Sequence, residues 1–324
     1  MTNLRDKLCY PVFELIGRTA DEAGLETYVV GGFVRDSIMG RECKDIDIVT
    51  IGSGIELAKK VSERIGKHSK VSGFKNFGTA MVHFKEEDED WQVEFVGARK
   101  ESYSHDSRKP IVEDGTLEDD QLRRDFTINA MAICLNESRY GELIDPFDGI
   151  GDIKRNIIKT PCDPDITFSD DPLRMLRAIR FAARLDFSIH PDTFEAVKRN
   201  AHRIEIVSME RNIEELNKMI LSAHPSMGFR LLDKSGLLSL IFPELSNLKG
   251  AEDMNGKTHK DNFKHTLEVL DNVSKVSDDL FLRWAAILHD IGKPFCKRFD
   301  KKIGFSFHGH ELKGAKMVKP IFRR

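Results

Sequence analysis

The 324-residue sequence contains no uninterrupted apolar run close to the roughly 20 residues that are needed to span a bilayer. Its first ten residues, Met1–Tyr10, are mixed and charged and contain no signal-peptide core. Internal repeats and low-complexity tracts are also absent from the sequence. We therefore expect a cytoplasmic globular protein of two or three domains, with no membrane association and no obligatory protein partner.

Cysteine is scarce: there are five, and no two of them form a C-x-x-C pair. This spacing argues against a thiolate zinc site and favours a reducing compartment. The net charge is only −3, yet two segments are basic. Residues 174–203 contain seven Lys or Arg against three Asp or Glu, and residues 293–324 contain ten against two. Each segment is a candidate surface for a polyanion, the alternative being a solvated charged surface.

A glycine turn is the first motif. Gly31 and Gly32 follow the apolar run Tyr28–Val30, which predicts a strand that ends in a turn and opens a helix. Backbone N–H groups of such a turn can approach phosphate oxygens, and Arg35 is placed to clamp a triphosphate. Asp36 is expected to hold Arg35 or to cap the helix.

A pair of carboxylates follows the turn. Asp45 and Asp47 lie on an alternating strand, where side chains two residues apart point to the same face. Two like charges about 4 Å apart repel by roughly 4 kcal/mol at an effective dielectric near 20, so a cation is expected between them. Oxygen ligands suit Mg²⁺. Glu94, on a strand predicted to be adjacent, would complete a catalytic trio for two Mg²⁺ ions, unless it is an exposed glutamate paired with a surface base.

Taken in order, these motifs resemble those of class II tRNA nucleotidyltransferases (CCA-adding enzymes) and bacterial poly(A) polymerases, within the polymerase-β-like nucleotidyltransferase superfamily. The head motif of that family matches residues 31–47, and its Arg-Arg-Asp motif matches residues 123–125. The resemblance implies that Arg124 contacts the nucleotide phosphates and that Asp125 accepts a hydrogen bond from the ribose 2′-OH. It also places Asn129 in the nucleotide site.

A further motif begins a helix after Asp170. At ~100° per residue, Asp171, Arg174, Arg177 and Arg180 share one broad face, which is either functional or a solvated basic face. The family's motif places Asp171 and Arg174 on the incoming base. C and A both present an amino donor beside a ring-nitrogen acceptor, which the Asp171 acceptor and the Arg174 donor can pair with. G and U present a carbonyl and a ring N–H there, which leaves both side chains mispaired. Arg177 and Arg180 are expected to brace this pair or to reach the phosphates.

The last segment contains His265, His289, Asp290 and His310, which resemble the start of an HD-type metal phosphohydrolase domain. Neutral imidazoles and a carboxylate can bind a divalent ion. The usual final aspartate of that motif does not occur before Arg324. We therefore expect a truncated domain, with a helical scaffold and a partial or empty site.

The predicted fold is an α+β nucleotidyltransferase head with a small mixed sheet of four or five strands (residues 1–150), then an all-α neck and body (151–248) and an incomplete helical HD-like domain (249–324). Residues 99–122 are expected to form a loop. The predicted activity is template-independent addition of C and A, from CTP and ATP, to tRNA 3′ ends by two-metal phosphoryl transfer that releases pyrophosphate. Addition of only C, only A or a poly(A) tail stays open, as does an HD phosphohydrolase whose head binds a nucleotide.

Overall fold

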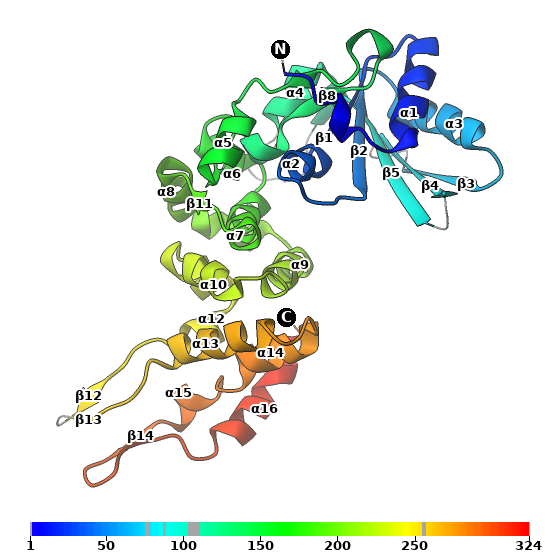
Figure 1. Ribbon diagram of the computed structural model, residues 1–324. Helices are drawn as coiled ribbons and strands as arrows, with labels where there is room; N and C mark the ends of the chain where they lie inside the picture. Colours follow the sequence, from blue (N-terminus) through cyan, green and yellow to red (C-terminus); the bar gives the residue numbers. More distant parts are fainter. Residues whose placement is uncertain (1, 75–77, 87–88, 103–110, 255–256, 324) are drawn as a thin grey trace. The chain divides into compact units, whose positions relative to one another are not determined.

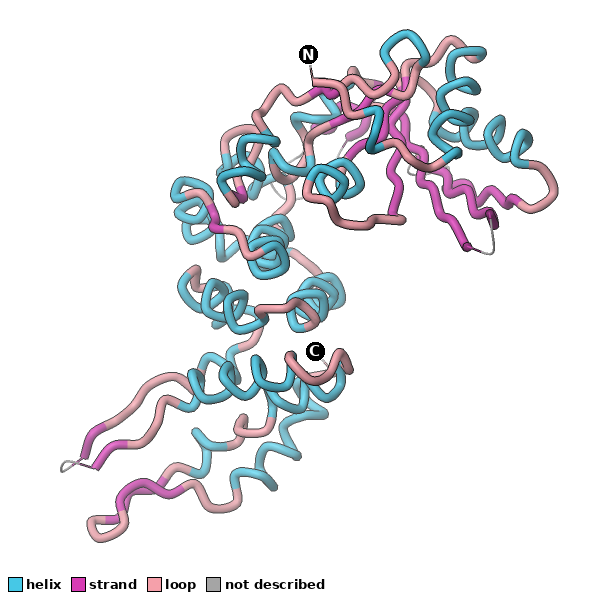
Figure 2. The backbone as a smooth tube through the Cα atoms, in the orientation of Figure 1, coloured by secondary structure: helices cyan, strands magenta, loops and turns pink. Residues whose placement is uncertain are grey.

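The computed structural model describes residues 2–74, 78–86, 89–102, 111–254 and 257–323. Its contacts divide the chain into two compact units, Met1–Asp163 and Pro164–Arg324 (Figure 1). Figure 2 shows that the first unit combines a sheet with helices, while helices dominate the second. The predicted order of an α+β head followed by a helical part is thus confirmed. The division falls after Asp163, beyond the predicted end of the first domain at residue 150.

The head is built on a seven-stranded sheet. In spatial order its strands are β3 (Ser69–Phe74), β4 (Thr79–Glu86), β5 (Glu89–Gly97), β2 (Asp45–Thr50), β1 (Thr27–Val30), β8 (Ala132–Cys134) and β9 (Leu143–Ile144). β2 and β5 pair in parallel, and the other neighbours pair antiparallel. β1 is fully buried, whereas the alternating strand β2 buries Ile46, Ile48, Val49 and Thr50 and leaves Asp45 exposed and Asp47 half-buried.

Three N-terminal helices pack on this sheet: α1 (Pro11–Glu22), α2 (Gly32–Ile38) and α3 (Gly54–Ile65). α3 contacts β3, β4 and β5 through Leu57, Ala58 and Val61, which recur at helical spacing. α1 approaches the sheet closely at Gly17, where a Cβ would lie 2.0 Å from the carbonyl oxygen of Leu135. The remaining head elements are η1 (Arg5–Lys7), β6 (Arg99–Ser102), β7 (Ile111–Asp114), α4 (Leu117–Leu122), η3 (Thr127–Asn129), η4 (Glu137–Arg139), α5 (Gly149–Arg155) and β10 (Ile157–Ile158).

Two predictions about the head are wrong. The sheet has seven strands rather than four or five, because β8 and β9, of three and two residues, are too short to show an alternating pattern. Residues 99–122 are not simply a loop. β6 pairs antiparallel with β7, and α4 follows behind a capping box at Thr116. Within the part of the chain that the structure describes, β6 and β7 form a sheet of two strands and carry charged residues, so hydrophobic periodicity gives no sign of them.

Helices of the second unit share one hydrophobic core that extends from Phe168 to Ile291. The helical part was predicted to begin after Phe168, but its first helix, α6, already begins at Pro164. The helices are α6 (Pro164–Asp170), α7 (Leu173–Leu185), α8 (Pro191–Asn200), η5 (Ala201–Ile206), α9 (Met209–Ile220), α10 (Pro225–Lys234), α11 (Leu237–Ile241), α12 (Pro243–Ser246), α13 (Asn262–Ser274), α14 (Leu280–Leu288), α15 (Lys293–Cys296) and α16 (His310–Ile321). Short strands accompany them: β11 (Ser188–Ile189), β12 (Asp253–Met254), β13 (Lys257–Thr258), β14 (Arg298–Asp300) and β15 (Gly304–Ser306).

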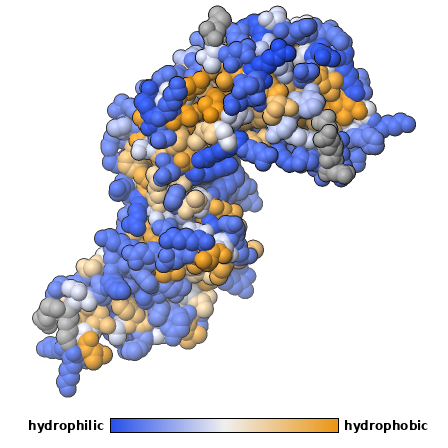
Figure 3. All heavy atoms as spheres, in the orientation of Figure 1, coloured by the Kyte–Doolittle hydropathy of each residue, from blue (hydrophilic) through white to orange (hydrophobic). Residues whose placement is uncertain are grey.

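Hydrophilic side chains cover much of the face drawn in Figure 3, and apolar residues appear between them in small patches. Among the described residues, no helix combines the length and the apolar character that crossing a bilayer requires.

Arg283 is the largest fully buried side chain and joins three helices of the second unit. Its guanidinium donates to the carbonyl oxygens of Ile220 at the end of α9 and of Ser222 just after it. It also donates to the carbonyl oxygens of Ser274, at the end of α13, and Ser277, and it pairs with the Asp278 carboxylate. It thereby satisfies carbonyls that helix ends leave without intrahelical partners.

Replacing Arg283 by methionine is expected to lower the free energy of unfolding by about 3 kcal/mol or more, since several buried carbonyl groups lose their donor. Urea unfolding of the full chain measures this. Arg230→Met is the matched control, because Arg230 is exposed on α10 and its loss should change stability by less than about 0.5 kcal/mol. Equal effects of the two substitutions would contradict the structural role of Arg283.

Candidate active site

The glycine turn lies between β1 and α2, directly beside the acidic strand β2. Gly31 has φ 73°, a conformation that L side chains rarely adopt. A Cβ on this residue would lie 3.1 Å from Asp47 Oδ2 and 3.2 Å from Arg124 Nη1. The turn therefore needs glycine for its backbone conformation and for the close approach of two charged side chains, one from each of two predicted motifs.

The three predicted carboxylates lie on neighbouring strands. β2 and β5 pair with Asp47 opposite Glu94, while Asp45 lies two residues earlier on β2 and is exposed. Burial raises the pKa of Asp47 to about 6; nearby Arg124 opposes the shift, and the charges of Asp45 and Glu94 add to it. Burial, followed by the charge of Asp45, also raises the pKa of Glu94. A divalent cation bound between these carboxylates would reduce their mutual repulsion and favour their ionised forms.

Asp120 is a residue of this site that the sequence reasoning missed. It is completely buried at the end of α4 and accepts hydrogen bonds from both arginines of the Arg-Arg-Asp motif. Arg123 Nε lies 3.0 Å from Oδ1, and Arg124 binds Oδ2 through Nε and Nη2 at 3.0 and 2.9 Å. Although burial raises the pKa of Asp120, these two guanidinium groups outweigh it and lower the pKa. The signal was a carboxylate three and four residues before two arginines, a helical spacing for ion pairs.

Arg35 lies inside the head. Both Arg35 and Asp36 are buried, and their side chains form a bidentate ion pair in which Nε and Nη2 each lie 2.8 Å from a carboxylate oxygen. The expected structural role of Asp36 as the residue that holds Arg35 is therefore confirmed. Arg35 also donates to Asn129, which donates to Asp125. The predicted contacts of Gly32, Arg35, Arg124, Asp125 and Asn129 with a nucleotide stay predictions.

The base-selecting motif belongs to the second unit, at the start of α7. Asp171 Oδ1 accepts from the backbone N–H of Leu173, and Arg174 Nη1 lies 3.5 Å from the carbonyl oxygen of Thr167. Both side chains are partly exposed. Arg177 lies with its guanidinium carbon 5.6 Å from the centre of the Phe181 ring. The roles of Asp171, Arg174 and Arg177 toward a nucleotide stay predictions.

Arg180 differs from its neighbours on α7, because it is only 5% exposed and Glu215 of α9 only 3%. Arg180 Nε donates to Glu215 Oε2 at 2.5 Å, and its guanidinium stacks 4.0 Å from the centre of the Phe181 ring. This pair joins two helices inside the second unit. Glu215 escaped the sequence reasoning because a glutamate beside the apolar residue Leu216 gives no sign of its distant partner.

The four HD residues come together around Asp290. His289 Nε2 lies 3.1 Å from Oδ2 and His310 Nε2 3.4 Å from Oδ1, while His265 Nε2 is 3.9 Å from Oδ2. His265, His289 and Asp290 offer ligand atoms within 4.8 Å of one another, which is compatible with a metal ion.

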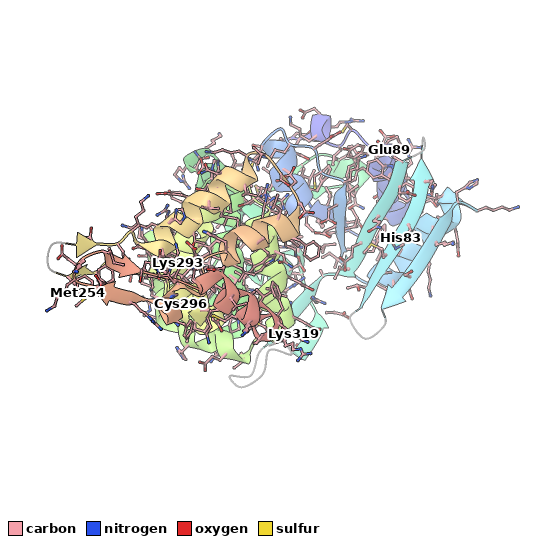
Figure 4. The ribbon with its side chains drawn as sticks, turned by 90° about the horizontal axis from the view of Figure 1, so that it is seen from below. His83, Glu89, Met254, Lys293, Cys296 and Lys319 are labelled. Atoms are coloured by element: carbon pink, nitrogen blue, oxygen red, sulfur yellow. The ribbon has the colours of Figure 1, made fainter. Side chains whose placement is uncertain are left out.

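Lys293 competes for the same carboxylate. It lies at the start of α15, the helix that also carries Cys296 (Figure 4). Its Nζ is 2.6 Å from Asp290 Oδ2. Although burial raises the pKa of Asp290, hydrogen bonds from His289 and Lys293 outweigh it and lower the pKa to about 2. The metal role of this cluster stays a prediction.

Comparisons with known proteins place the chain in a family. Family models match the Poly A polymerase head domain over residues 27–159, the probable RNA and SrmB-binding site of polymerase A over 186–249, and the HD domain over 262–324. The Multifunctional CCA protein of Shewanella frigidimarina is 34% identical over 316 residues, which cover 93% of this chain and 69% of that protein. This chain belongs to the family of tRNA nucleotidyltransferases and poly(A) polymerases.

Other members show how the family varies. The A-adding tRNA nucleotidyltransferase of Aquifex aeolicus is 44% identical over 175 residues, which are 54% of this chain and 20% of that protein. The solved structure of the Thermotoga maritima CCA-adding enzyme in complex with tRNA has a TM-score of 0.70 and 27% identity, and the match covers 89% of this chain and 66% of that one. The matched regions thus cover between a fifth and about two thirds of the length of these family members. The resemblance inferred from the motifs is confirmed.

Proposed function

We propose that the protein adds C and A, from CTP and ATP, to the 3′ ends of tRNA without a nucleic-acid template. The observation that carries the proposal is the group of Asp45, Asp47 and Glu94 on adjacent strands, beside a turn in which Gly31 adopts a positive φ and approaches Asp47 and Arg124 closely. A 3′-hydroxyl of the RNA attacks the α-phosphate of the nucleotide, and pyrophosphate leaves. Catalysis of this kind consists mainly of positioning and electrostatic stabilisation.

The carboxylate group fits Mg²⁺. All its ligand atoms are hard oxygens. Burial raises the pKa values of Asp47 and Glu94, and the negative charge of Asp45 adds to both shifts, so a divalent cation would favour the ionised carboxylates. Asp45 and Asp47, with Glu94, are the residues that would hold two ions. When bound, such ions supply electrostatic stabilisation of the attacking and the leaving oxygens. Arg124, fixed by Asp120, is directed toward this group and would hold phosphate oxygens.

Selection of the nucleotide is assigned to two other places. Asp125 would accept from the ribose 2′-OH, a group that deoxynucleotides lack. Asp171 and Arg174 would read the base, since their acceptor and donor match the edges of C and A and leave mispaired groups against G and U. A good bidentate contact discriminates by about 1–3 kcal/mol, and buried unpaired groups add to that cost. The basic segment 174–203 would follow the RNA backbone, so activity should fall as salt rises.

The decisive experiment combines the full chain with Mg²⁺, labelled CTP or ATP, and one of three tRNA transcripts. The first transcript lacks the terminal CCA, the second lacks CA, and the third ends in CC and lacks only the A. Extension of the first two by CTP and of the third by ATP is expected. Extension by CTP alone, by ATP alone or by a long A tail would identify one of the narrower activities in the family, as the A-adding relative exemplifies. Failure to extend any transcript would refute the proposal.

A second candidate activity is phosphate-ester hydrolysis at the cluster of His265, His289 and Asp290, which has metal-binding geometry. Asp45→Ala separates the two sites. Loss of all nucleotide incorporation with retained phosphate release would place a hydrolase beside the transferase. The five cysteines, no two of which form a C-x-x-C pair, also favour a reducing compartment such as the cytoplasm.

A further inference from the structure

A buried polar network in the head connects α2 to the Arg-Arg-Asp motif. Asp36 binds Arg35 in the bidentate pair described above, and Arg35 Nη1 donates to Asn129 Oδ1 at 2.6 Å. Asn129 Nδ2 donates in turn to Asp125 Oδ1 at 3.0 Å. All four residues are at most 7% exposed. In a low-dielectric interior, polar groups linked in this way hold one another in a single arrangement.

The orientation of the Asn129 amide follows from chemistry. A guanidinium has donors and no acceptor, so the Asn129 atom that faces Arg35 has to be the oxygen. The amide nitrogen is then directed toward Asp125, which accepts through Oδ1. Asp36 fixes Arg35, Arg35 fixes the Asn129 amide, and the amide fixes one oxygen of Asp125.

The Asp125 carboxylate is held at two points. Oδ1 accepts from Asn129 and also from the backbone N–H of Phe126 at 2.8 Å. Rotation of the carboxylate would break both bonds at once. The orientation of Asp125 therefore depends on the network behind it and not on its own rotamer alone.

We propose that Asn129 and Arg35 are positioning residues that select ribose by orienting Asp125, and that they do not themselves bind the nucleotide. The inference rests on the proposed function, in which Asp125 accepts from the ribose 2′-OH. The sequence prediction placed all three residues on the nucleotide. The structure distinguishes them, because Arg35 is 4% exposed and three of its nitrogens bind Asp36 and Asn129.

The test compares the affinities of CTP and dCTP for the full chain with Mg²⁺ by isothermal titration calorimetry. Asn129→Leu removes both amide contacts at similar volume, and Asn129→Asp keeps the acceptor for Arg35 but loses the donor for Asp125. Both should reduce the preference for CTP over dCTP about tenfold or more, as Asp125→Ala should. Because Asn129 acts through Asp125, Asn129→Leu should reduce the preference no further in an Asp125→Ala background.

Asn136→Leu is the matched control. Asn136 is likewise a buried asparagine of the head, and it bonds Thr27, Leu25 and Asp21 away from the motif. Its loss should lower the melting temperature as the loss of Asn129 does, without changing the ratio of the CTP and dCTP affinities.

Three results would overturn the inference in distinguishable ways. If the wild-type protein binds CTP and dCTP equally, the proposed role of Asp125 is refuted, and the proposed function of the network is refuted with it. If wild type prefers CTP and Asp125→Ala abolishes the preference, but Asn129→Leu retains it, only the positioning role is refuted. A double variant whose losses multiply would show that Asn129 touches the nucleotide independently of Asp125.

Discussion

Asp47→Asn is expected to reduce nucleotide incorporation at least about a thousandfold, which corresponds to about 4 kcal/mol of lost transition-state stabilisation. The substitution keeps the size of the side chain and removes the charge that would hold the cation opposite Glu94. Single-turnover extension of a tRNA transcript lacking CCA measures the effect. Activity within tenfold of wild type would contradict the assignment of Asp47 as a metal ligand.

Asp47→Asn, which lowers activity, is expected to raise the stability of the folded head. Burial raises the pKa of Asp47 to about 6, so the folded protein binds this proton more tightly than the unfolded chain does. Ionisation above that pH therefore costs stability, by about 3 kcal/mol when Mg²⁺ is absent. Asp47→Asn should accordingly stabilise the head at pH 7.5 in EDTA, and the gain should disappear as the pH falls from 6 to about 4.

Metal and control measurements complete this test. Mg²⁺ should raise the melting temperature of wild type at pH 7.5 and should have little effect on Asp47→Asn, because binding to the folded state alone is stabilising. Glu89→Gln is the control. Glu89 is the first residue of β5, the strand that also carries Glu94 (Figure 4), and it forms a surface ion pair with Lys44 at 2.9 Å. An ion pair exposed to solvent contributes little to stability, so this variant should behave as wild type.

Arg180→Leu is expected to lower the free energy of unfolding of the second unit by about 3–5 kcal/mol, because it leaves Glu215 buried without its guanidinium partner. Lys218, 3.7 Å from Glu215, is largely exposed and compensates only in part. Glu215→Leu should be similarly destabilising. The double leucine variant should recover most of the loss, since a well-packed apolar pair can replace a buried ion pair.

Tryptophan fluorescence makes this measurement specific. The chain has two tryptophans, and Trp91→Phe leaves Trp284 of the second unit as the only reporter during urea unfolding. Arg184→Leu is the control, because Arg184 is exposed on the same helix. If Arg180 instead served the nucleotide, Arg180→Leu would weaken CTP binding and leave the unfolding transition where it was.

Local patterns in the sequence determined the chemistry. The spacing of Asp45 and Asp47 places both carboxylates on one face of a strand wherever that strand lies, because the period of a strand is two. The glycines before them and the later Arg-Arg-Asp motif, in that order, were enough to indicate the family. Helical periodicity after Phe168 predicted the helical unit for the same reason, since it depends only on near neighbours in the chain.

The tertiary structure decided which residues distant in sequence interact with each other. The sequence predicted that the strand of Glu94 is adjacent to that of Asp47, but only the parallel register of β2 and β5 sets the two residues opposite each other. Nothing local marks Glu215 as the partner of Arg180, because that pair depends on which helices become neighbours. The sequence predicted nucleotide contacts, or the bracing of such contacts, for five arginines: Arg35, Arg124, Arg174, Arg177 and Arg180. Packing separates Arg35 and Arg180, which are buried in ion pairs, from Arg124 and Arg174, which keep partial exposure. A side chain's charge is set by the sequence, whereas the burial that makes it structural or functional is set by the fold.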